Sequence, residues 1–322
     1  MKYLKSIKQA IIALIGLGLA LSSVAQEYPN KPIKVIVPYA AGGTTDQVAR
    51  AIQVPLSELL GQPVVIENKP GAGGTIGSDM VAKAPADGYT LLFGNTGPNV
   101  VVSLMRKTPY DIIKDFQPIS TVIISPMMLA VPTDSPAKNF KEFLALAKQD
   151  GANMNYGSVG NGSLSHLTGE YFNTAAGLKL QHIPYNGGAP MLAGFVGGQL
   201  QSAFVTGLDG ASMLATGKVK YLAIATEKQS DILPNVQAMG ELIPGFKSSA
   251  WFGVLAPKGI PKDVLDKLNK AIVKVVARPD IQQLFKSKNV DPRSTSPEGM
   301  SKIIQEELRQ WAPLVQKSKI EM

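Results

Sequence analysis

The stretch 33-IKVIVPYAAGGTTDQVARAIQVPLSELL-60 puts a strand, a glycine-rich loop and a helix in direct succession. Ile33 to Val37 is a short β-branched run, which predicts a strand, and the apolar spacing from Thr44 to Leu60 predicts a helix. The loop between them contains Gly42 and Gly43. A strand that leads through such a loop into a helix is the building unit of α/β proteins with parallel sheets.

The same alternation continues along the chain and restarts after residue 120, so the sequence predicts an α/β fold with two lobes. We expect each lobe to be a parallel sheet covered by helices. The other predicted strands are Val64 to Glu67, Thr90 to Phe93, Met127 to Val131, Asn153 to Tyr156, Lys179 to Pro184, Gln201 to Val205 and Val219 to Ala225. The predicted helices between them are Ile76 to Lys83, Phe140 to Lys148, Leu164 to Ala175 and Ala189 to Val196.

The last third of the chain is predicted to be almost wholly helical after the apolar run Ala250 to Leu255. Because amphipathic helices cannot bury their apolar faces alone, we expect these helices to pack back onto the first lobe. The first lobe is then discontinuous, with residues 26–125 and 248–322, while residues 126–247 form the second and two strands cross between them. The three predicted helices are Asp263 to Val276, Asp280 to Ser287 and Pro297 to Lys317.

The amino terminus has the three zones of a secretory signal peptide over residues 1–25. A basic zone with Lys2, Lys5 and Lys8 precedes an apolar run that is too short for a bilayer, which needs about 20 such residues. Small residues follow, up to Ala25. We expect cleavage after Ala25, so that the mature chain loses three lysines, its net charge falls from +8 to +5, and it is not inserted in the membrane.

The sequence contains no cysteine, so no disulfide stabilises the fold and no lipidated amino-terminal cysteine anchors the chain. An exported protein that diffuses freely needs an outer membrane to retain it, which predicts the periplasm of a Gram-negative bacterium. The lysines from Lys262 to Lys288 recur at helical spacing among acidic residues, without a basic block interleaved with aromatic residues. This pattern disfavours nucleic-acid binding and favours solvated helix faces.

Glycine-rich loops follow five of the predicted strands, where open α/β sheets bind their ligands. Each loop leads into a helix whose first N–H groups lack partners and carry partial positive charge. The loops Pro38 to Asp46, Gly71 to Gly77 and Gly157 to Ser163 contain no Lys or Arg. We therefore expect an anion that is held by amides, hydroxyls and waters. The alternative is that these glycines only form turns and that Thr44 and Ser163 only cap helices.

Cofactor motifs and catalytic constellations have little support. Gly71 to Ile76 lacks the last glycine of a dinucleotide fingerprint, and no loop ends in Gly-Lys-Ser or Gly-Lys-Thr, so no nucleotide cofactor is expected. Two histidines and no cysteine argue against a metal site. Ser163 and His166 could form a nucleophile and base, but without a Gly-x-Ser-x-Gly elbow a helix cap is the simpler interpretation. Asp46 and Asp209 could be paired acids, although the helix dipole explains Asp46 more simply.

Seven segments carry a recognisable pattern: Ile36 to Asp46 with Ala49 and Arg50, Glu67 to Gly77, Ala86 to Leu92, Asn155 to Gly157, His166 with Leu167, His182 to Tyr185, and Trp251 to Pro257. They resemble the solute receptors of tripartite tricarboxylate transporters, also called Bug proteins, and the similarity covers essentially the whole mature chain. The resemblance implies a two-lobed periplasmic-binding-protein fold of Venus-flytrap shape, type II-like, that closes on a small carboxylate. Such a receptor delivers its ligand to a membrane carrier.

The resemblance also implies that main-chain and water contacts from the first lobe hold the carboxylate, while the second lobe contacts the rest of the ligand. In the first lobe, the expected contacts are Tyr39, Ala41, Gly42, Thr44, Thr45, Asp46, Gly74, Thr75, Ile76, Asn95 and Thr96. In the second lobe, they are Ser158, Gly160, Asn161, Gly162, Ser163, His166, Tyr185, Asn186, Gly187, Gly188, Ala189, Thr206 and Asp209.

One segment departs from the family pattern, in which an aspartate often follows a Gly-Gly-Gln or Gly-Gly-Lys turn and another ends the next strand. Gln201 and Val205 take those positions here. Without these acids, nothing obvious would pair with an ammonium group unless Asp209 reaches the ligand. The sequence therefore disfavours a cationic or amino-acid ligand and favours a di- or tricarboxylate or an aromatic acid.

The leading hypothesis is a monomeric transport receptor without enzymatic activity, whose partners are its carboxylate and the integral membrane subunits of a tripartite transporter. A periplasmic sensor that docks on a signalling kinase is an alternative, because both roles use the same closed form. A periplasmic hydrolase that uses His166 with Ser163 or Ser165 is a third hypothesis.

Overall fold

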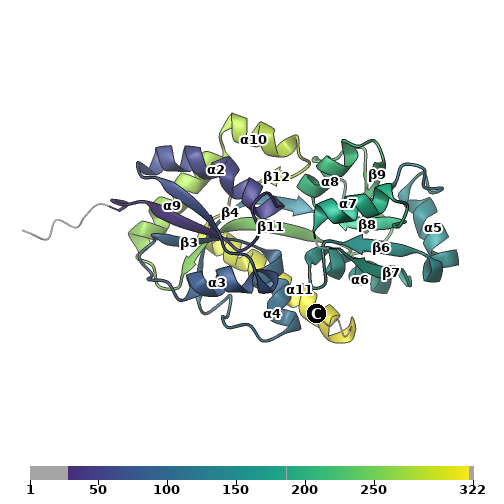
Figure 1. The fold of residues 1–322 in the computed structure, drawn as a ribbon, viewed down its shortest axis with the longest axis horizontal. Helices are drawn as coiled ribbons and strands as arrows, with labels where there is room; N and C mark the ends of the chain where they lie inside the picture. Colours follow the sequence, from purple (N-terminus) through teal and green to yellow (C-terminus); the bar gives the residue numbers. More distant parts are fainter. Residues whose placement is uncertain (1–27, 186, 319–322) are drawn as a thin grey trace, which may run out of the picture.

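The structure is a computed structural model that describes residues 28–185 and 187–318. The predicted signal peptide, residues 1–25, and the expected ligand contact Asn186 lie outside the described residues. The described chain forms two six-stranded sheets with helices packed around them, and the two halves lie side by side along the long axis of the molecule (Figure 1). This is the two-lobed α/β fold that the sequence predicts.

Six strands form the first sheet: β1 (Ile33–Val37), β2 (Val64–Asn68), β3 (Thr90–Asn95), β4 (Phe116–Pro126), β11 (Ser249–Pro257) and β12 (Asp291–Pro292). Their order across the sheet is β12-β4-β11-β3-β1-β2. β1 pairs in parallel with β2 and β3, whereas β11 runs antiparallel to β3 and β4, and β12 antiparallel to β4. The carboxyl ends of β1, β2 and β3 therefore share one edge.

The helices of the first lobe are α2 (Thr44–Leu60), α3 (Thr75–Ala82), α4 (Val102–Met105), α9 (Lys262–Val276), α10 (Pro279–Lys286) and α11 (Pro297–Ser318), with the short turns η1 (Ala72–Gly74) and η2 (Gly97–Val101). α2 packs against α9 on one side of the sheet, and α3, α4 and α11 lie on the other (Figure 1). α9 and α11 both contact β4, so the carboxyl-terminal helices return to the first sheet.

Six further strands form the second sheet: β5 (Met128–Pro132), β6 (Asn155–Ser158), β7 (Gln181–Pro184), β8 (Ser202–Val205), β9 (Val219–Ile224) and β10 (Gln237–Ala238). Their order is β10-β9-β5-β8-β6-β7. β6 pairs in parallel with β7 and β8, and β10 with β9, whereas β5 is antiparallel to both of its neighbours.

The helices of the second lobe are α5 (Phe140–Asp150), α6 (Leu164–Ala176), α7 (Gly188–Val196) and α8 (Gly207–Leu214), with the short turns η3 (Gly151–Asn153) and η4 (Met239–Glu241). The parallel strands β6, β7 and β8 lead into α6, α7 and α8 respectively. Three helix amino termini therefore gather at one edge of the second sheet.

The chain enters the second sheet at Met127, between β4 and β5, and returns to the first sheet after β10. The two crossing segments lie side by side, since the Met127 N–H donates to the Ser248 carbonyl at 2.9 Å. This crossing also explains why the sheets are mixed, whereas the alternation of elements predicted parallel sheets: β4 leaves the first lobe and the neighbouring β11 comes back. The lobe boundaries, 26–125 with 248–322 and 126–247, stay a prediction.

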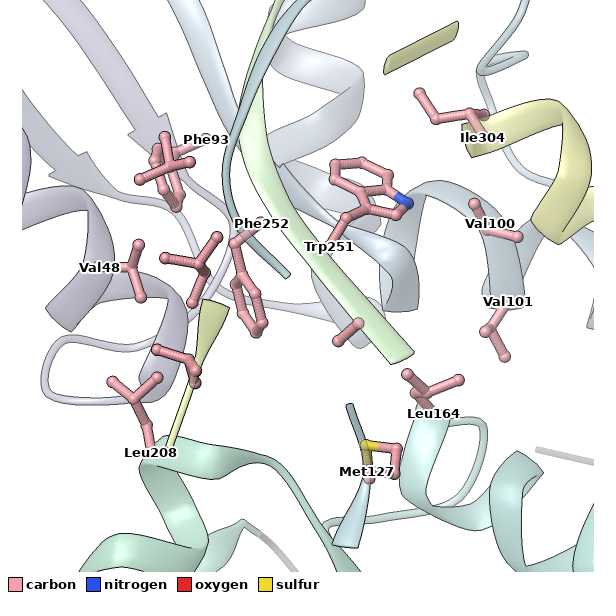
Figure 2. Close-up of a cluster of buried hydrophobic side chains, with 14 of the residues drawn as sticks. Val48, Phe93, Val100, Val101, Met127, Leu164, Leu208, Trp251, Phe252 and Ile304 are labelled. Atoms are coloured by element: carbon pink, nitrogen blue, oxygen red, sulfur yellow. The ribbon is translucent and has the colours of Figure 1, made fainter. Parts of the chain in front are cut away.

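One buried apolar cluster extends from the first sheet into the second. Trp251 and Phe252 leave β11 on opposite sides, and Met127, Leu164 and Leu208 bring the crossing segment, α6 and α8 into the same cluster (Figure 2). A separate apolar cluster covers the other face of the second sheet. Apolar packing therefore continues through the junction of the lobes, where the loops of both sheets meet.

Candidate functional site

A cavity of about 510 Å³ lies between the two lobes. Its wall is formed by the loops that follow β1, β2, β3, β6, β7 and β8, together with the start of α4 and residues of both crossing segments. The loops belong to the carboxyl ends of parallel strands, which is the usual place for ligands in α/β sheets. The cavity is therefore the candidate ligand site.

The first wall is built where β1 leads into α2. Thr44 and Thr45 are the first two residues of α2, so their N–H groups have no acceptor within the helix. The Thr45 Oγ1 accepts a hydrogen bond from Asn95 Nδ2 at 2.8 Å, and Asn95 Oδ1 accepts the Gly97 N–H at 2.8 Å. Burial raises the pKa of Tyr39 well above its usual range, which keeps its hydroxyl neutral. This wall thus presents hydroxyl and amide groups in fixed orientations.

Asp46 holds the loop of the first wall in place from behind. Its carboxylate accepts hydrogen bonds from the Gly42 N–H at 2.8 Å, from Asn68 Nδ2 at 2.9 Å and from Arg50 Nε at 2.9 and 3.0 Å. Burial alone would raise the pKa of Asp46, but the hydrogen bonds from these donors outweigh it and lower the pKa. Gly42 has a φ of 85°, a conformation that favours glycine. Asp46 therefore positions the loop and does not line the cavity.

The second wall is the loop between β6 and α6. Ser163 caps α6, because its Oγ accepts the His166 N–H at 3.2 Å, and it also donates to the Gly160 carbonyl at 2.6 Å. The Ser165 Oγ lies 2.9 Å from the Ser163 Oγ and accepts the Val159 N–H at 3.0 Å. The loop is thus closed on itself by hydroxyl groups, and its glycine backbone faces the cavity.

Two stacked histidines support this loop from below. The rings of His166 and His182 lie 3.8 Å apart with an interplanar angle of 6°, and Tyr156 stacks on His182 at 5.0 Å. His166 Nδ1 accepts the Gly162 N–H at 3.2 Å, and His182 Nε2 lies 2.7 Å from the Ser158 Oγ. Burial lowers the pKa of His166 to about 4, and burial with the neighbouring His166 lowers that of His182 to about 3. Both rings are neutral at physiological pH and buttress the loop.

Asp209 joins the first wall to the helix α8 of the second lobe. It lies in the first turn of α8, and its Oδ2 accepts a hydrogen bond from the Thr206 Oγ1 at 2.8 Å. Its Oδ1 accepts a hydrogen bond from the Thr44 Oγ1 at 3.0 Å, which connects the first turns of α2 and α8 across the cavity. Burial raises the pKa of Asp209, while the hydrogen bonds from Thr206 and Thr44 oppose this effect.

The electrostatics of the cavity come from the backbone and from one acid. Within the described residues, the lining contains no Lys, Arg or His side chain. The amino termini of α2, α6, α7 and α8 all meet the cavity, and each contributes partial positive charge and free N–H groups. Such a wall can hold an anionic group through amides and hydroxyls without a cationic side chain.

Residues 48–320 match the family described as the tripartite tricarboxylate transporter family receptor. The chain belongs to this family. BugT from Bordetella pertussis (strain Tohama I) is similar to the receptor, with 32% identity over 316 residues that cover 96% of this chain and 97% of BugT.

Solved structures share the fold of this receptor. The periplasmic binding protein BugD is 35% identical, with a TM-score of 0.79, 91% of this chain covered and 99% of BugD. Rpa4515 of R. palustris with adipate is 30% identical, with a TM-score of 0.83, 92% of this chain covered and 99% of that chain. The fold class is therefore that of periplasmic binding proteins. In residues 28–185 and 187–318 of the receptor, no helix has the length and apolar character needed to cross a membrane.

The receptor brings many of the expected ligand contacts together. Those that line the cavity are Tyr39, Ala41, Thr44, Thr45, Asn95, Gly160, Asn161, Gly162, Ser163, Gly187, Gly188, Thr206 and Asp209. Those that do not line it are Gly42, Asp46, Gly74, Thr75, Ile76, Thr96, Ser158, His166, Tyr185 and Ala189. The role of each lining residue as a ligand contact stays a prediction.

The expected ligand contacts that do not line the cavity are buried elsewhere, exposed to solvent or bonded to other residues. Thr96 is fully buried, and its hydroxyl donates to Glu307 Oε1 at 3.2 Å. Ile76 is 55% exposed to solvent, and the Tyr185 hydroxyl donates to Gln199 Oε1 at 3.3 Å. Within the loop from Pro70 to Gly77, only Gly73 reaches the cavity. The glycine-rich pattern thus identifies the loops that border the cavity more often than the residues that line it.

Several residues that line the cavity of the receptor are not predicted as ligand contacts by the sequence. Gly43, Gly97 and Ser165 belong to loops that the glycine pattern singled out or border them, so that signal could have found them. The apolar lining residues of the crossing segments and of β8 belong to no polar or glycine-rich pattern in the sequence. The lining residues that are not among the ligand contacts expected from the sequence are Ala40, Gly43, Gly73, Gly97, Val102, Met127, Val159, Leu164, Ser165, Phe204, Val205, Ala250 and Phe252.

The described hydrogen bonds do not form the catalytic pairs that the sequence leaves open as alternatives. His166 Nδ1 accepts a main-chain N–H, and the Ser163 hydroxyl is bonded to Gly160 and Ser165, so the two do not form a nucleophile–base contact among the described hydrogen bonds. Asp46 is bonded to Arg50 behind the loop, while Asp209 lines the cavity, so they are not paired acids. The family of this chain is a family of transporter receptors, and the related BugD is a periplasmic binding protein.

Proposed function

We propose that this receptor binds a small organic carboxylate in the cavity between its lobes and delivers it to the integral membrane subunits of a tripartite transporter. The observation that carries the proposal is the cavity wall, where four helix amino termini meet and where the described residues offer amides and hydroxyls but no cationic side chain. The related protein Rpa4515, whose structure contains adipate, supports a carboxylate as the ligand class.

The proposed mechanism is a ligand-dependent shift from an open to a closed arrangement of the lobes. The hydrogen bond between Thr44 and Asp209 supports this mechanism, because it joins the two lobes directly across the cavity. A ligand that contacts both walls stabilises the closed form by its difference in affinity for the two forms. The membrane subunits would then recognise the closed, loaded receptor in the periplasm after cleavage of the signal peptide near Ala25.

Binding is tested by thermal shift and calorimetry on the mature receptor with a panel of di- and tricarboxylates, aromatic acids and amino acids. At a ligand concentration of 100 times Kd, linkage predicts a gain of about 2.7 kcal/mol in the free energy of unfolding. Binding of no organic acid would refute the proposal.

Delivery is tested separately, by uptake of the labelled ligand in cells with and without the receptor gene. Loss of uptake on deletion, with recovery by the wild-type gene, is the expected result. Undiminished uptake by the deletion strain would contradict delivery and leave sensing as the use of the bound ligand.

A further inference from the structure

Asp209 is the one acidic side chain that lines the cavity among the residues described in the structure. Its two carboxylate oxygens accept hydrogen bonds from the hydroxyls of Thr44, at 3.0 Å, and Thr206, at 2.8 Å. Both donors are neutral, and within residues 28–185 and 187–318 no charged side chain pairs with Asp209. Among the described residues, the negative charge of Asp209 therefore has no cationic partner.

A charge in this position is unfavourable unless something compensates it. A carboxylate that loses water without gaining a cation is destabilised, and burial accordingly raises the pKa of Asp209. The amino termini of α2 and α8 compensate only in part, because each acts as a fraction of a positive charge. A carboxylate can accept about four hydrogen bonds, so the two from Thr44 and Thr206 leave capacity for further donors.

Helix capping does not account for the position of Asp209. Thr206 already caps α8, since its Oγ1 accepts the Asp209 N–H at 3.4 Å. An acid in the first turn stabilises a helix equally well when it points to solvent, as Asp263 does at the start of α9. Asp209 instead faces the cavity and reaches the opposite lobe.

We infer that Asp209 selects a ligand that carries a protonated amine in addition to its carboxylate, with the amine placed against Asp209. The inference rests on the proposed function and names the ligand class of the same cavity. The amine supplies the positive charge and the N–H donors that Asp209 lacks, while the ligand carboxylate is held by the amide and hydroxyl groups of the loops. A second ionised carboxylate at this end would meet a like charge at short distance.

This ligand class differs from the one favoured by the sequence. The absence of acids at positions 201 and 205, where Gln and Val stand, disfavours an amino-acid ligand unless Asp209 reaches the ligand. The structure places Asp209 in the lining of the cavity, and Gln201 outside it. The acidic side chain that lines this cavity, Asp209, therefore belongs to α8 and not to the end of β8.

The test compares acids that share one carboxylate and the same number of methylene groups but end in an ammonium, a methyl or a carboxylate group. Three chain lengths are used: 3-aminopropanoate, butanoate and succinate; 4-aminobutanoate, pentanoate and glutarate; 5-aminopentanoate, hexanoate and adipate. Calorimetry gives Kd for each acid with the wild-type mature receptor, with Asp209→Asn and with Asp263→Asn. The last variant is the matched control, an exposed first-turn acid on α9 far from the cavity lining.

We expect at least one amino acid of the series to bind the wild type at least tenfold more tightly than the diacid of equal length. Asp209→Asn should weaken that amino acid at least tenfold and strengthen the diacid, whereas Asp263→Asn should change neither. A merely structural defect would weaken both ligands, so the opposite directions identify the charge of Asp209 as the cause. If Asp209→Asn does not fold, Asp209→Ser replaces it, and the order of affinities for the wild type remains a test by itself.

Tighter binding of diacids than of amino acids by the wild type would overturn the inference and leave the proposed function intact. The same holds if Asp209→Asn leaves the ratio of the two affinities unchanged. Binding of no acid in this series or in the wider panel would overturn the proposed function itself.

Discussion

Glu307 is a buried acid at the junction of the lobes, and the stability of the receptor should depend on its protonation. It lies on α11 with 8% of its surface exposed, and it accepts hydrogen bonds from the Trp251 Nε1 at 2.8 Å and the Thr96 Oγ1 at 3.2 Å. Burial raises the pKa of Glu307 from 4.5 to about 8, although the hydrogen bonds from Thr96 and Trp251 lower it in part. The substitution Glu307→Gln keeps the shape of the side chain and removes its titration.

The sign of the effect follows from proton binding in the two states. Between pH 4.5 and about 8, the folded receptor keeps a proton on Glu307 that the unfolded chain has lost. The stabilisation of the folded receptor by protonated Glu307 is therefore complete below pH 4.5, and it is lost as the pH rises through the folded-state pKa of Glu307. One proton corresponds to about 1.4 kcal/mol per pH unit, so wild-type stability should decline relative to Glu307→Gln by about 5 kcal/mol over this interval.

The measurement is urea unfolding of wild type and Glu307→Gln at pH values from 5 to 9. Glu306→Gln, an exposed neighbour on α11, is the control and should run parallel to the wild type. A second readout uses the two tryptophans of the chain. In a Trp311→Phe background, the fluorescence of Trp251 should titrate near pH 8, and Glu307→Gln should abolish this transition. Parallel stability curves for wild type and Glu307→Gln would refute the argument, because they would show that Glu307 titrates alike in both states.

Three further predictions concern the loops around the cavity. Asp46→Asn weakens the anchor of Gly42 and should lower the free energy of unfolding in urea by about 2 kcal/mol, whereas a loss under about 0.5 kcal/mol would contradict the anchoring role. Thr44→Val removes the donor to Asp209, worth about 1 kcal/mol, so Kd measured by calorimetry should rise about fivefold, and an unchanged Kd would show that this bond does not favour closure. Burial lowers the pKa of His182 from 6.5 to about 3, so stability falls as the pH drops through this interval. His182→Gln should make that fall shallower by about 1.4 kcal/mol per pH unit, and equal slopes for the two proteins would rule this out.

The sequence predicts an element best where local pattern and packing agree. The predicted bounds of β1 and α2 match the structure in full, because a β-branched run precedes the helix and Gly61, at a φ of 70°, ends it. The sequence does not predict β4, because Pro118 interrupts its apolar run. In the structure, the pairing of β4 with β11 contains irregular register shifts. β4 is stabilised by its pairing with β11, which follows the second lobe in the chain. A local sequence pattern cannot reveal this long-range pairing.

The helix α8 shows how tertiary packing overrides propensity. Gly207 and Gly210 both lower the helix propensity of this short segment, so the sequence does not predict it. In the structure, a Cβ on Gly210 would collide with the ring of Tyr221, and one on Gly207 with the carbonyl of Asn289. Glycine is required for close packing at both positions. Asp209 within the same helix is nevertheless an expected ligand contact, because the resemblance places a contact in the segment after the strand Gln201 to Val205.

The cavity illustrates the limit of reading a site from loops alone. Pattern and resemblance identify which loops meet, because the carboxyl ends of parallel strands share an edge. They do not identify which residue of a loop faces inward, since that depends on how the lobes meet. Phe252 and Met127 line the cavity only because the crossing segments run between the lobes. Apolar lining residues of this kind look like ordinary core in a sequence.

The bond between Thr44 and Asp209 couples ligand selection to closure. Asp209 lies on the second lobe and Thr44 on the first, so the carboxylate receives this donor only when the lobes are together. A ligand amine beside Asp209 adds a favourable charge interaction in that closed form, whereas a ligand carboxylate at the same place opposes it. In an open form, the same groups are surrounded by water and the difference is screened. The preference for an amino acid over a diacid should therefore appear in the equilibrium between the open and the closed receptor. We expect a diacid to dissociate faster than an amino acid, while the two acids associate at similar rates.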